Sequence, residues 1–85
     1  MSDYTVNIAR SAQKQLDKAP RNMQGRLRSA IDALAREPRP PGCKKLVGRD
    51  AWRIREGDWR IIYQIRDRIL EVEVIELGHR KDVYD

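Results

Sequence analysis

Residues 52–65 read WRIREGDWRIIYQI, and the alternation within this stretch decides the fold. Apolar side chains alternate with arginines on both sides of a central Glu-Gly-Asp. A period of two predicts β-strands that each have one buried face. Gly57-Asp58 is typical of a two-residue hairpin turn, because glycine reaches the positive φ that such a turn requires. We therefore expect an antiparallel hairpin centred on these two residues.

The turn also predicts the register of the hairpin. A slip of one residue would place arginines opposite large apolar side chains and split the core. In the predicted register the large apolar side chains share one face, with the exception of Ile62. The three arginines, Arg53, Arg55 and Arg60, share the other face. The expected cross-strand pairs are Glu56 with Trp59, Arg55 with Arg60, Ile54 with Ile61, and Trp52 with Tyr63.

N-terminal to the hairpin, the pattern predicts one strand and two helices. Residues 4–8 alternate like a short half-buried strand, and residues 9–19 carry alanine and leucine at helical spacings. Pro20 suits the first turn of a second helix, which the proline-rich residues 38–42 end. The buried stripe of that second helix is expected to be Met23, Leu27, Ile31 and Leu34.

C-terminal to the hairpin, the chain predicts one more strand. Residues 67–68 are typical of a tight turn, and residues 69–77 then alternate between apolar and acidic side chains. This alternation places Val72 and Val74 on one face and Leu77 on the other. The hairpin and this strand together form a three-stranded antiparallel meander.

The order of these elements predicts an α+β fold. It consists of an N-terminal strand, a helical hairpin and the meander, with a small antiparallel sheet packed against two helices. A chain of 85 residues is expected to form a single domain, residues 1–85.

Composition excludes several classes of protein. Cys43 is the only cysteine, which excludes an internal disulfide and a multi-cysteine zinc site. We expect no cofactor and no metal, because no carboxylates and histidines cluster at ligand spacing. The N-terminus lacks a signal peptide, and no apolar run could span a bilayer. A cytoplasmic protein that does not enter the membrane is therefore expected.

The chain is basic, with a formal net charge of +5 and a pI near 9.8. This charge suits a polyanion or an acidic protein as partner, although a merely soluble surface would also explain it. The loop before the hairpin is basic too. It could follow a nucleic-acid backbone or lie solvated; its cations are Lys44, Lys45 and Arg49.

The opposed Arg55 and Arg60 indicate an anion site. Like charges directly opposite each other destabilise a sheet, so an anion between them would relieve the repulsion. The alternative is that both long side chains spread into water. Arginine presents a planar fork of donors that matches phosphate oxygens, and it keeps its charge. A phosphodiester is the ligand that this pattern favours.

A second group of candidates follows the last strand. His79 is the only histidine, and its ordinary pKa near 6.5 suits acid–base work. Tyr84 could stack on a nucleobase or simply pack the terminus. Arg80 lies between them in sequence and adds a further guanidinium group. A loop past the last strand could bring this group beside the arginine face.

These motifs resemble the RelE/ParE superfamily of bacterial toxins, with the RelE branch most similar. They are K-L-V-G, W-R-I-R, G-D-W-R-I-I-Y and G-H-R…V-Y, in this order over nearly the whole chain. The resemblance implies the toxin of a type II toxin–antitoxin module. Such toxins cleave mRNA on the ribosome without a metal, and the message's 2′-hydroxyl attacks the adjacent phosphate. The implied partners are a cognate antitoxin, the ribosome and mRNA.

The resemblance also implies site residues. Arg53 and Arg55 match two basic residues of the strand before the hairpin, and Arg60 matches the arginine just after it. Arg80 matches the arginine after the final glycine, and Tyr84 matches the late tyrosine. The expected catalytic set is thus Arg55, Arg60, His79, Arg80 and Tyr84, and the expected RNA-binding set is Lys44, Lys45, Arg49 and Arg53.

The chain departs from RelE relatives in one respect that concerns the general base. Those relatives often carry lysine at the positions of Arg53 and Arg55, and arginine cannot give up its proton as a buried lysine can. His79 or a ribosomal group would then take that role. Two alternatives stay open: a ParE-like toxin that acts on DNA gyrase, and a basic nucleic-acid-binding module without catalysis.

Overall fold

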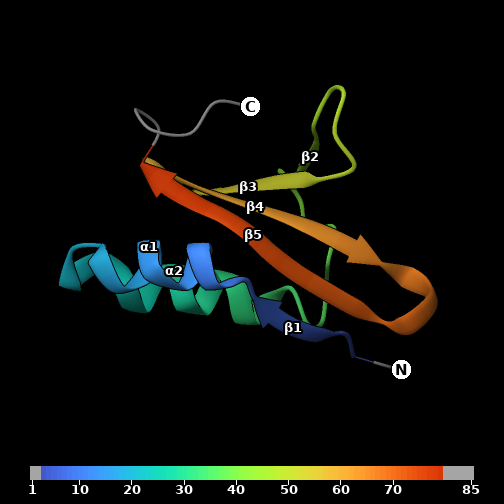
Figure 1. The fold of residues 1–85 in the computed structure, drawn as a ribbon, viewed down its shortest axis with the longest axis horizontal. Helices are drawn as coiled ribbons and strands as arrows, with labels where there is room; N and C mark the ends of the chain where they lie inside the picture. The colour runs from blue at the N-terminus through green and yellow to red at the C-terminus, as the bar shows by residue number, and fades with distance from the viewer. Residues whose placement is uncertain (1–2, 80–85) are drawn as a thin grey trace.

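Two helices cover one face of a five-stranded sheet in the computed structural model, which describes residues 3–79 (Figure 1). The strand order is β1-β5-β4-β3-β2. No helix within the described range is long and apolar enough to cross a membrane. The elements are β1 (Thr5–Ile8), α1 (Arg10–Lys18), α2 (Arg21–Ala33), β2 (Lys44–Lys45), β3 (Trp52–Glu56), β4 (Trp59–Arg66), the 3-10 turn η1 (Asp67–Ile69) and β5 (Glu71–His79).

The predicted strand, helical hairpin and meander are confirmed, but the sheet is mixed rather than antiparallel. β1 pairs in parallel with β5, from Thr5 opposite Glu71 to Ile8 opposite Val74. The two helices between β1 and the meander carry the chain back across the sheet, which is how parallel strands are connected. A short strand, β2, also extends the sheet at its far edge.

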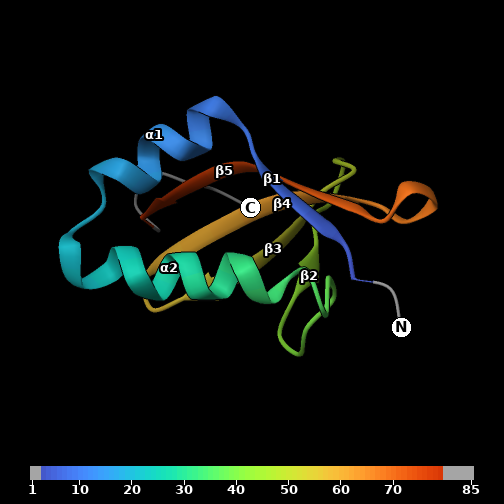
Figure 2. The ribbon, with the colours of Figure 1, turned by 90° about the horizontal axis from the view of Figure 1, so that it is seen from below.

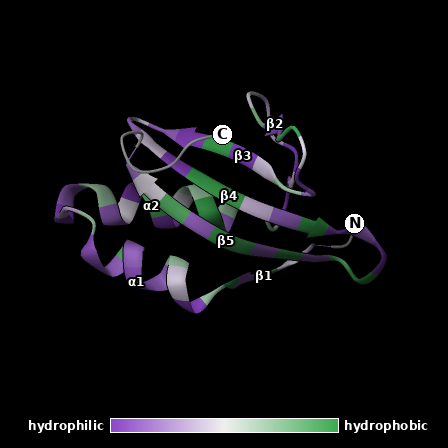
Figure 3. Cartoon of the chain, turned by 45° about the horizontal axis from the view of Figure 1, so that its top comes forward, coloured by the Kyte–Doolittle hydropathy of each residue, from purple (hydrophilic) through white to green (hydrophobic). Residues whose placement is uncertain are grey.

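The helix-facing core follows the predicted periodicity. Figure 2 shows α1 and α2 side by side against the sheet, and Figure 3 shows apolar residues along β4 and β5. All four residues of the predicted stripe on and just after α2 are buried. Their apolar partners in the core include Leu16 of α1 and the strand residues Ile61, Tyr63, Val72 and Val74.

The β3–β4 hairpin has the register that the two-residue turn predicts. All four expected cross-strand pairs are present, including Arg55 opposite Arg60. Gly57 has a φ of 60°, in the left-handed region that glycine adopts at little cost. The turn chemistry and the apolar pattern therefore select the same pairing.

A β-bulge in β5 reverses one prediction. The pairing of β4 with β5 shifts after Ile62, and Ile75 is an extra residue on β5. One extra residue inverts the alternation of faces beyond it. Leu77, which simple alternation placed opposite to Val74, is therefore buried in the same helix-facing core.

The loop between β2 and β3 folds over the other face of the sheet. Its residues Leu46 and Ala51 are buried against Ile62, with Ile75 packed beside them. This small second core explains why Ile62 departs from the apolar face of the hairpin. Figure 1 shows the loop rising on the side of the sheet opposite to the helices.

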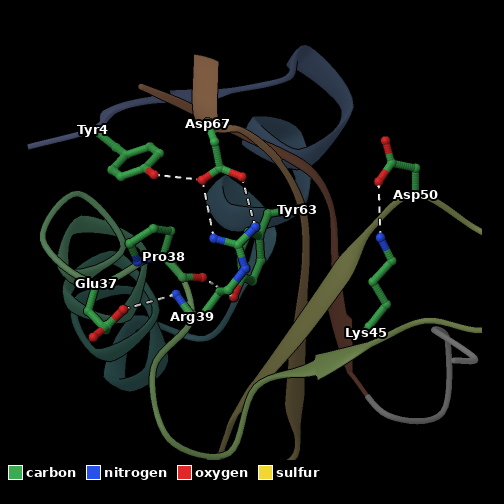
Figure 4. Close-up of polar contacts among 8 residues, drawn as sticks. All are labelled: Tyr4, Glu37, Pro38, Arg39, Lys45, Asp50, Tyr63 and Asp67. Carbon is green, nitrogen blue, oxygen red and sulfur yellow. Dashed lines mark hydrogen bonds and ion pairs between the residues drawn. The ribbon is translucent and has the colours of Figure 1, made fainter. Parts of the chain in front are cut away.

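A polar cluster joins three segments that are distant in sequence (Figure 4). The Asp67 carboxylate accepts a hydrogen bond from the Tyr4 hydroxyl at 2.6 Å and two from the Arg39 guanidinium at 3.2 and 2.9 Å. The buried Tyr63 hydroxyl donates to the carbonyl of Pro38 at 2.7 Å. The start of the sheet, the segment after α2 and the β4–β5 turn are thereby tied together.

The Asp67 contacts predict a specific loss of stability in acid. Hydrogen bonds from Arg39 and then from Tyr4 lower the pKa of Asp67 from 3.8 to about 2. Its contribution is fully present above the unfolded pKa and is lost as the pH falls toward 2. We expect Asp67→Asn to lose less stability than the wild type between pH 4 and pH 2. Urea unfolding at both pH values, with Asp32→Asn as a matched control, measures this; equal losses would contradict it.

The core predicts a large effect for Leu27, which is 0% exposed on the buried stripe of α2. Leu27→Ala removes buried methyl groups and leaves a cavity, so the free energy of unfolding should fall by about 2–5 kcal/mol. Gln15→Ala on the exposed surface of α1 should change it by about 0.5 kcal/mol or less. Urea titrations of the two variants test the contrast, and a loss below about 1 kcal/mol for Leu27→Ala would be inconsistent with this core.

Candidate nucleic-acid interface

The outer face of the sheet, which points away from the helices, carries two opposed arginines at the end of the hairpin. Arg55 of β3 lies directly opposite Arg60 of β4. Two guanidinium groups so placed repel each other, and an anion held by both would stabilise the pair. We call the adjacent depression of about 100 Å³ the hairpin hollow; it is lined by Arg55, Gly57, Asp58, Trp59 and Arg60.

Arg53 is the third arginine of this face. The sequence placed it among the expected RNA-binding residues, but its side chain is buried. The exposed fraction of Arg53 is only 6%. Arg53 pairs across the hairpin with Ile62, which is part of the small second core. Burial lowers the pKa of Arg53, and the charges of Arg55 and Arg60 lower it further. Arginine still keeps its proton at neutral pH. Arg53 therefore places a buried guanidinium group behind the exposed Arg55 and the half-buried Arg60.

The predicted RNA-binding loop is partly engaged in ion pairs of its own. Lys45 contacts Asp50 at 3.2 Å, and Arg49 contacts Glu76 of β5 at 3.0 Å. Lys44 is exposed and lies in the short strand β2, where it pairs with Arg53 rather than belonging to the loop. Ion pairs at the surface contribute little stability, so both cations can exchange their carboxylates for phosphates. The Arg49–Glu76 pair also holds the loop against the sheet.

His79 lies away from the arginines. It is paired with Trp59 across the sheet, and the two rings meet edge to face with their centroids 5.9 Å apart. Trp59 packs against the helix-facing core, whereas Arg60 is opposite Gly78 on the other side. The extra residue Ile75 causes this reversal, because without the bulge His79 would alternate onto the outer face.

Asp58 is a residue that the sequence indicated only as part of a turn. It is exposed and lines the hairpin hollow with Arg55 and Arg60. A carboxylate beside an anion site can accept a proton, which the arginines cannot do. The amino-acid sequence did contain one indication of this role for Asp58: the residue lies in the turn between two strands that carry arginines. The predicted Arg80 and Tyr84 lie outside the described residues, so their roles stay predictions.

No group of three His, Cys, Asp or Glu side chains within residues 3–79 is arranged to hold a metal ion. The hollow can bind an anion by paired, charge-assisted hydrogen bonds from two guanidinium groups. Opposite Arg60, Gly78 presents no side chain.

Comparison with known proteins agrees with the fold and the hairpin. Residues 6–84 match the family described as the ParE toxin of the type II toxin–antitoxin system parDE. The chain belongs to the RelE/ParE superfamily of type II toxins. It is 32% identical to Toxin RelG of Mycobacterium tuberculosis over 85 residues, which cover 95% of each chain. The predicted superfamily is thus confirmed.

Solved structures of RelE toxins share the fold of this superfamily member. The archaeal RelE–RelB complex from Pyrococcus horikoshii matches with a TM-score of 0.83 and 29% identity, covering 95% of this chain and 99% of that one. The intact E. coli RelBE toxin–antitoxin complex matches with a TM-score of 0.77 and 25% identity, covering 89% and 95%. The α+β architecture is that of RelE toxins.

The opposed arginines of the toxin predict binding of free phosphate. A ligand present at 100 times its Kd stabilises the folded state by about 2.7 kcal/mol. A charge-assisted hydrogen bond contributes about 1.5–3 kcal/mol. Arg60→Gln should therefore lower the affinity for phosphate at least about tenfold. Thermal unfolding over a phosphate titration measures this shift. Arg28→Gln, on the exposed surface of α2, is the control; an equal shift in both variants would argue against the hollow.

Proposed function

We propose that this type II toxin is a ribosome-dependent endoribonuclease that cleaves mRNA and thereby stops translation. The observation that carries the proposal is the pair Arg55 and Arg60, which lie opposite each other in the hairpin and line the hairpin hollow. Similarity to Toxin RelG over 95% of the chain supports the same class of toxin. In the proposed reaction the 2′-hydroxyl of the message attacks the adjacent phosphate. No metal is needed, because arginine side chains stabilise the developing charge.

The arginines stabilise the charge that develops during this attack. The pentavalent phosphorus gains negative charge on its non-bridging oxygens, and donors aimed at those oxygens lower the barrier. Arg55 and Arg60 offer two such forks, and the buried Arg53 raises the positive potential behind them. By the resemblance to RelE toxins, we propose that Arg80 belongs to the same set and that Tyr84 stacks on a nucleobase.

The site offers fewer side chains for proton transfer than for stabilising negative charge. His79 contacts Trp59 on the helix-facing side, so we propose Asp58 in the hairpin hollow as an acceptor for the 2′-hydroxyl proton. The ribosome supplies positioning: holding the message with its 2′-hydroxyl in line removes about 7 kcal/mol or more from the barrier. The loop cations Lys44, Lys45 and Arg49 favour docking on ribosomal RNA.

The proposed partner of this toxin is an antitoxin, since two similar toxins were solved as RelE–RelB and RelBE complexes. The toxin would act in the cytoplasm, where ribosomes and mRNA meet. One finding favours a second function: the matching family model is named for ParE toxins, which implies inhibition of DNA gyrase.

Removing either opposed arginine should abolish most cleavage. Loss of one charge-stabilising donor costs about a hundredfold or more in rate, and we expect this for Arg55→Ala, Arg60→Ala and Arg80→Ala. Arg28→Ala, which removes an exposed arginine of α2, should cleave like the wild type. Mapping of RNA ends on translated messages gives the rates. Wild-type rates in all three site variants would refute the assigned site.

The two candidates for the proton acceptor can be separated. A general base adds about a hundredfold to ten-thousandfold, so Asp58→Asn should lose at least about a hundredfold in single-turnover rate on ribosome-bound mRNA. His79→Gln should stay within a few-fold of the wild type. The opposite order of losses would return the role to His79.

The ribosome requirement separates this function from its alternative. One message incubated with and without ribosomes should be cut rapidly only in their presence, because positioning supplies most of the rate. Equal cleavage in both reactions would show a self-sufficient ribonuclease. Continued amino-acid incorporation together with gyrase-linked DNA breaks would instead identify the ParE-like function.

A further inference from the structure

Arg26 of α2 connects the helices to the end of the β3–β4 hairpin. Its guanidinium group donates two hydrogen bonds to the same carboxylate oxygen of Glu56, Oε2, from Nε at 3.1 Å and from Nη2 at 2.8 Å. Its remaining nitrogen, Nη1, lies 3.6 Å from the sulfur of Met23, which is one turn earlier on the helix. Arg26 and Glu56 are 30 residues apart in sequence, so this contact joins two distant elements. We call the pair the hairpin clamp.

The hairpin clamp lies where the chain turns from β3 to β4. Glu56 is half-buried and is the last residue of β3, directly before the turn at Gly57-Asp58. A Cβ atom at Gly57 would lie 3.6 Å from Nη2 of Arg26 and 3.7 Å from Cε of Met23. Met23 and Arg26 are three residues apart, so they share one face of the helix. An apolar side chain and an ion pair of α2 therefore both support the turn.

The supported turn carries the residues of the hairpin hollow. Arg55 precedes Glu56 on β3, Asp58 lies in the turn, and Arg60 begins the outer face of β4. Glu56 pairs with Trp59, which packs against the helix-facing core, and alternation directs Arg55 to the other side. A displacement of the backbone at Glu56 therefore also displaces the opposed arginines. Misplacement of reacting groups by about 1 Å can cost about a hundredfold in rate.

We propose that Arg26 is a positioning residue of this toxin, which acts through Glu56 to hold Arg55 and Arg60 in the geometry that binds a phosphate. This inference rests on the proposed nuclease function and adds a residue of the helical layer to it. Surface ion pairs contribute little stability, and Arg26 is exposed. The hairpin clamp therefore acts on the geometry of the hollow more than on the stability of the fold.

A purely electrostatic role for Arg26 makes a different prediction. A cation near the hollow would attract an anion, and the carboxylate of Glu56 would repel it. Under that role Glu56→Gln removes a negative charge and strengthens phosphate binding. If the clamp positions the arginines, Glu56→Gln breaks the clamp and weakens phosphate binding. The sign of the change in affinity thus separates the two roles.

The first test is a titration of the purified toxin with inorganic phosphate, followed by the NMR signals of the Nε–H groups of Arg55 and Arg60. We expect Arg26→Gln and Glu56→Gln each to raise the Kd for phosphate at least about fivefold. The double variant should raise the Kd no further, since both substitutions break one contact. A wild-type toxin that does not bind phosphate at these arginines would overturn the proposal.

Arg28→Gln is the matched control, because Arg28 lies on the same helix and has an ion pair of its own, with Asp32 at 3.7 Å. It should bind phosphate as the wild type does, and urea should unfold it at the same concentration as Arg26→Gln. Tighter phosphate binding by Glu56→Gln would show the electrostatic role and overturn the proposal. Equal phosphate affinities for Arg26→Gln and Arg28→Gln would show that the clamp positions nothing.

Cleavage of ribosome-bound mRNA separates this inference from the proposed function. Arg26→Gln should cut at least about tenfold more slowly at saturating toxin, with an unchanged toxin concentration at the half-maximal rate. A direct contact of Arg26 with ribosomal RNA would instead raise that concentration, leave the saturating rate unchanged and overturn the proposal. A wild-type toxin that binds phosphate without cleaving would refute the nuclease, and the phosphate titrations would still decide the clamp. Wild-type cleavage kinetics in Arg26→Gln would refute only the clamp.

Discussion

The two-residue turn at Gly57-Asp58 holds the β3–β4 hairpin in the one register on which the other contacts of the sheet depend. In that register Ile54 and Ile61 face the helices, and Arg55 and Arg60 face away from them. A shift by one residue would exchange the two faces. The turn therefore determines the core and the arginine-bearing face together, so that folding of the toxin already assembles the charged pair.

The two faces of the sheet differ: one packs against the helices, and the other carries the arginines of the candidate site. Helices occupy one face, and the loop after β2 covers part of the other, where Leu46 and Ala51 bury Ile62. The hairpin hollow lies at the other end of the outer face and is lined by Arg55 and Arg60. A rigid strand pair presents these arginines, which limits the entropy lost when they bind a phosphate. This arrangement suits the function proposed above, in which the toxin supplies charge and the ribosome positions the RNA.

The helices, the hairpin register and the pairing of Arg55 with Arg60 are predictable from the amino-acid sequence, because they depend on local periodicity and turn chemistry. Only the tertiary structure decided which residues meet beyond that range. The bulge at Ile75 moved Leu77 and His79 to the helix-facing side. The adjacent apolar residues Val74 and Ile75 interrupt the alternation there, but only the pairing with β4 shows that Ile75 is the extra residue. The burial of Arg53 depended on a loop that packs from outside the hairpin. Such contacts join residues through space, and a pattern along the chain does not encode them.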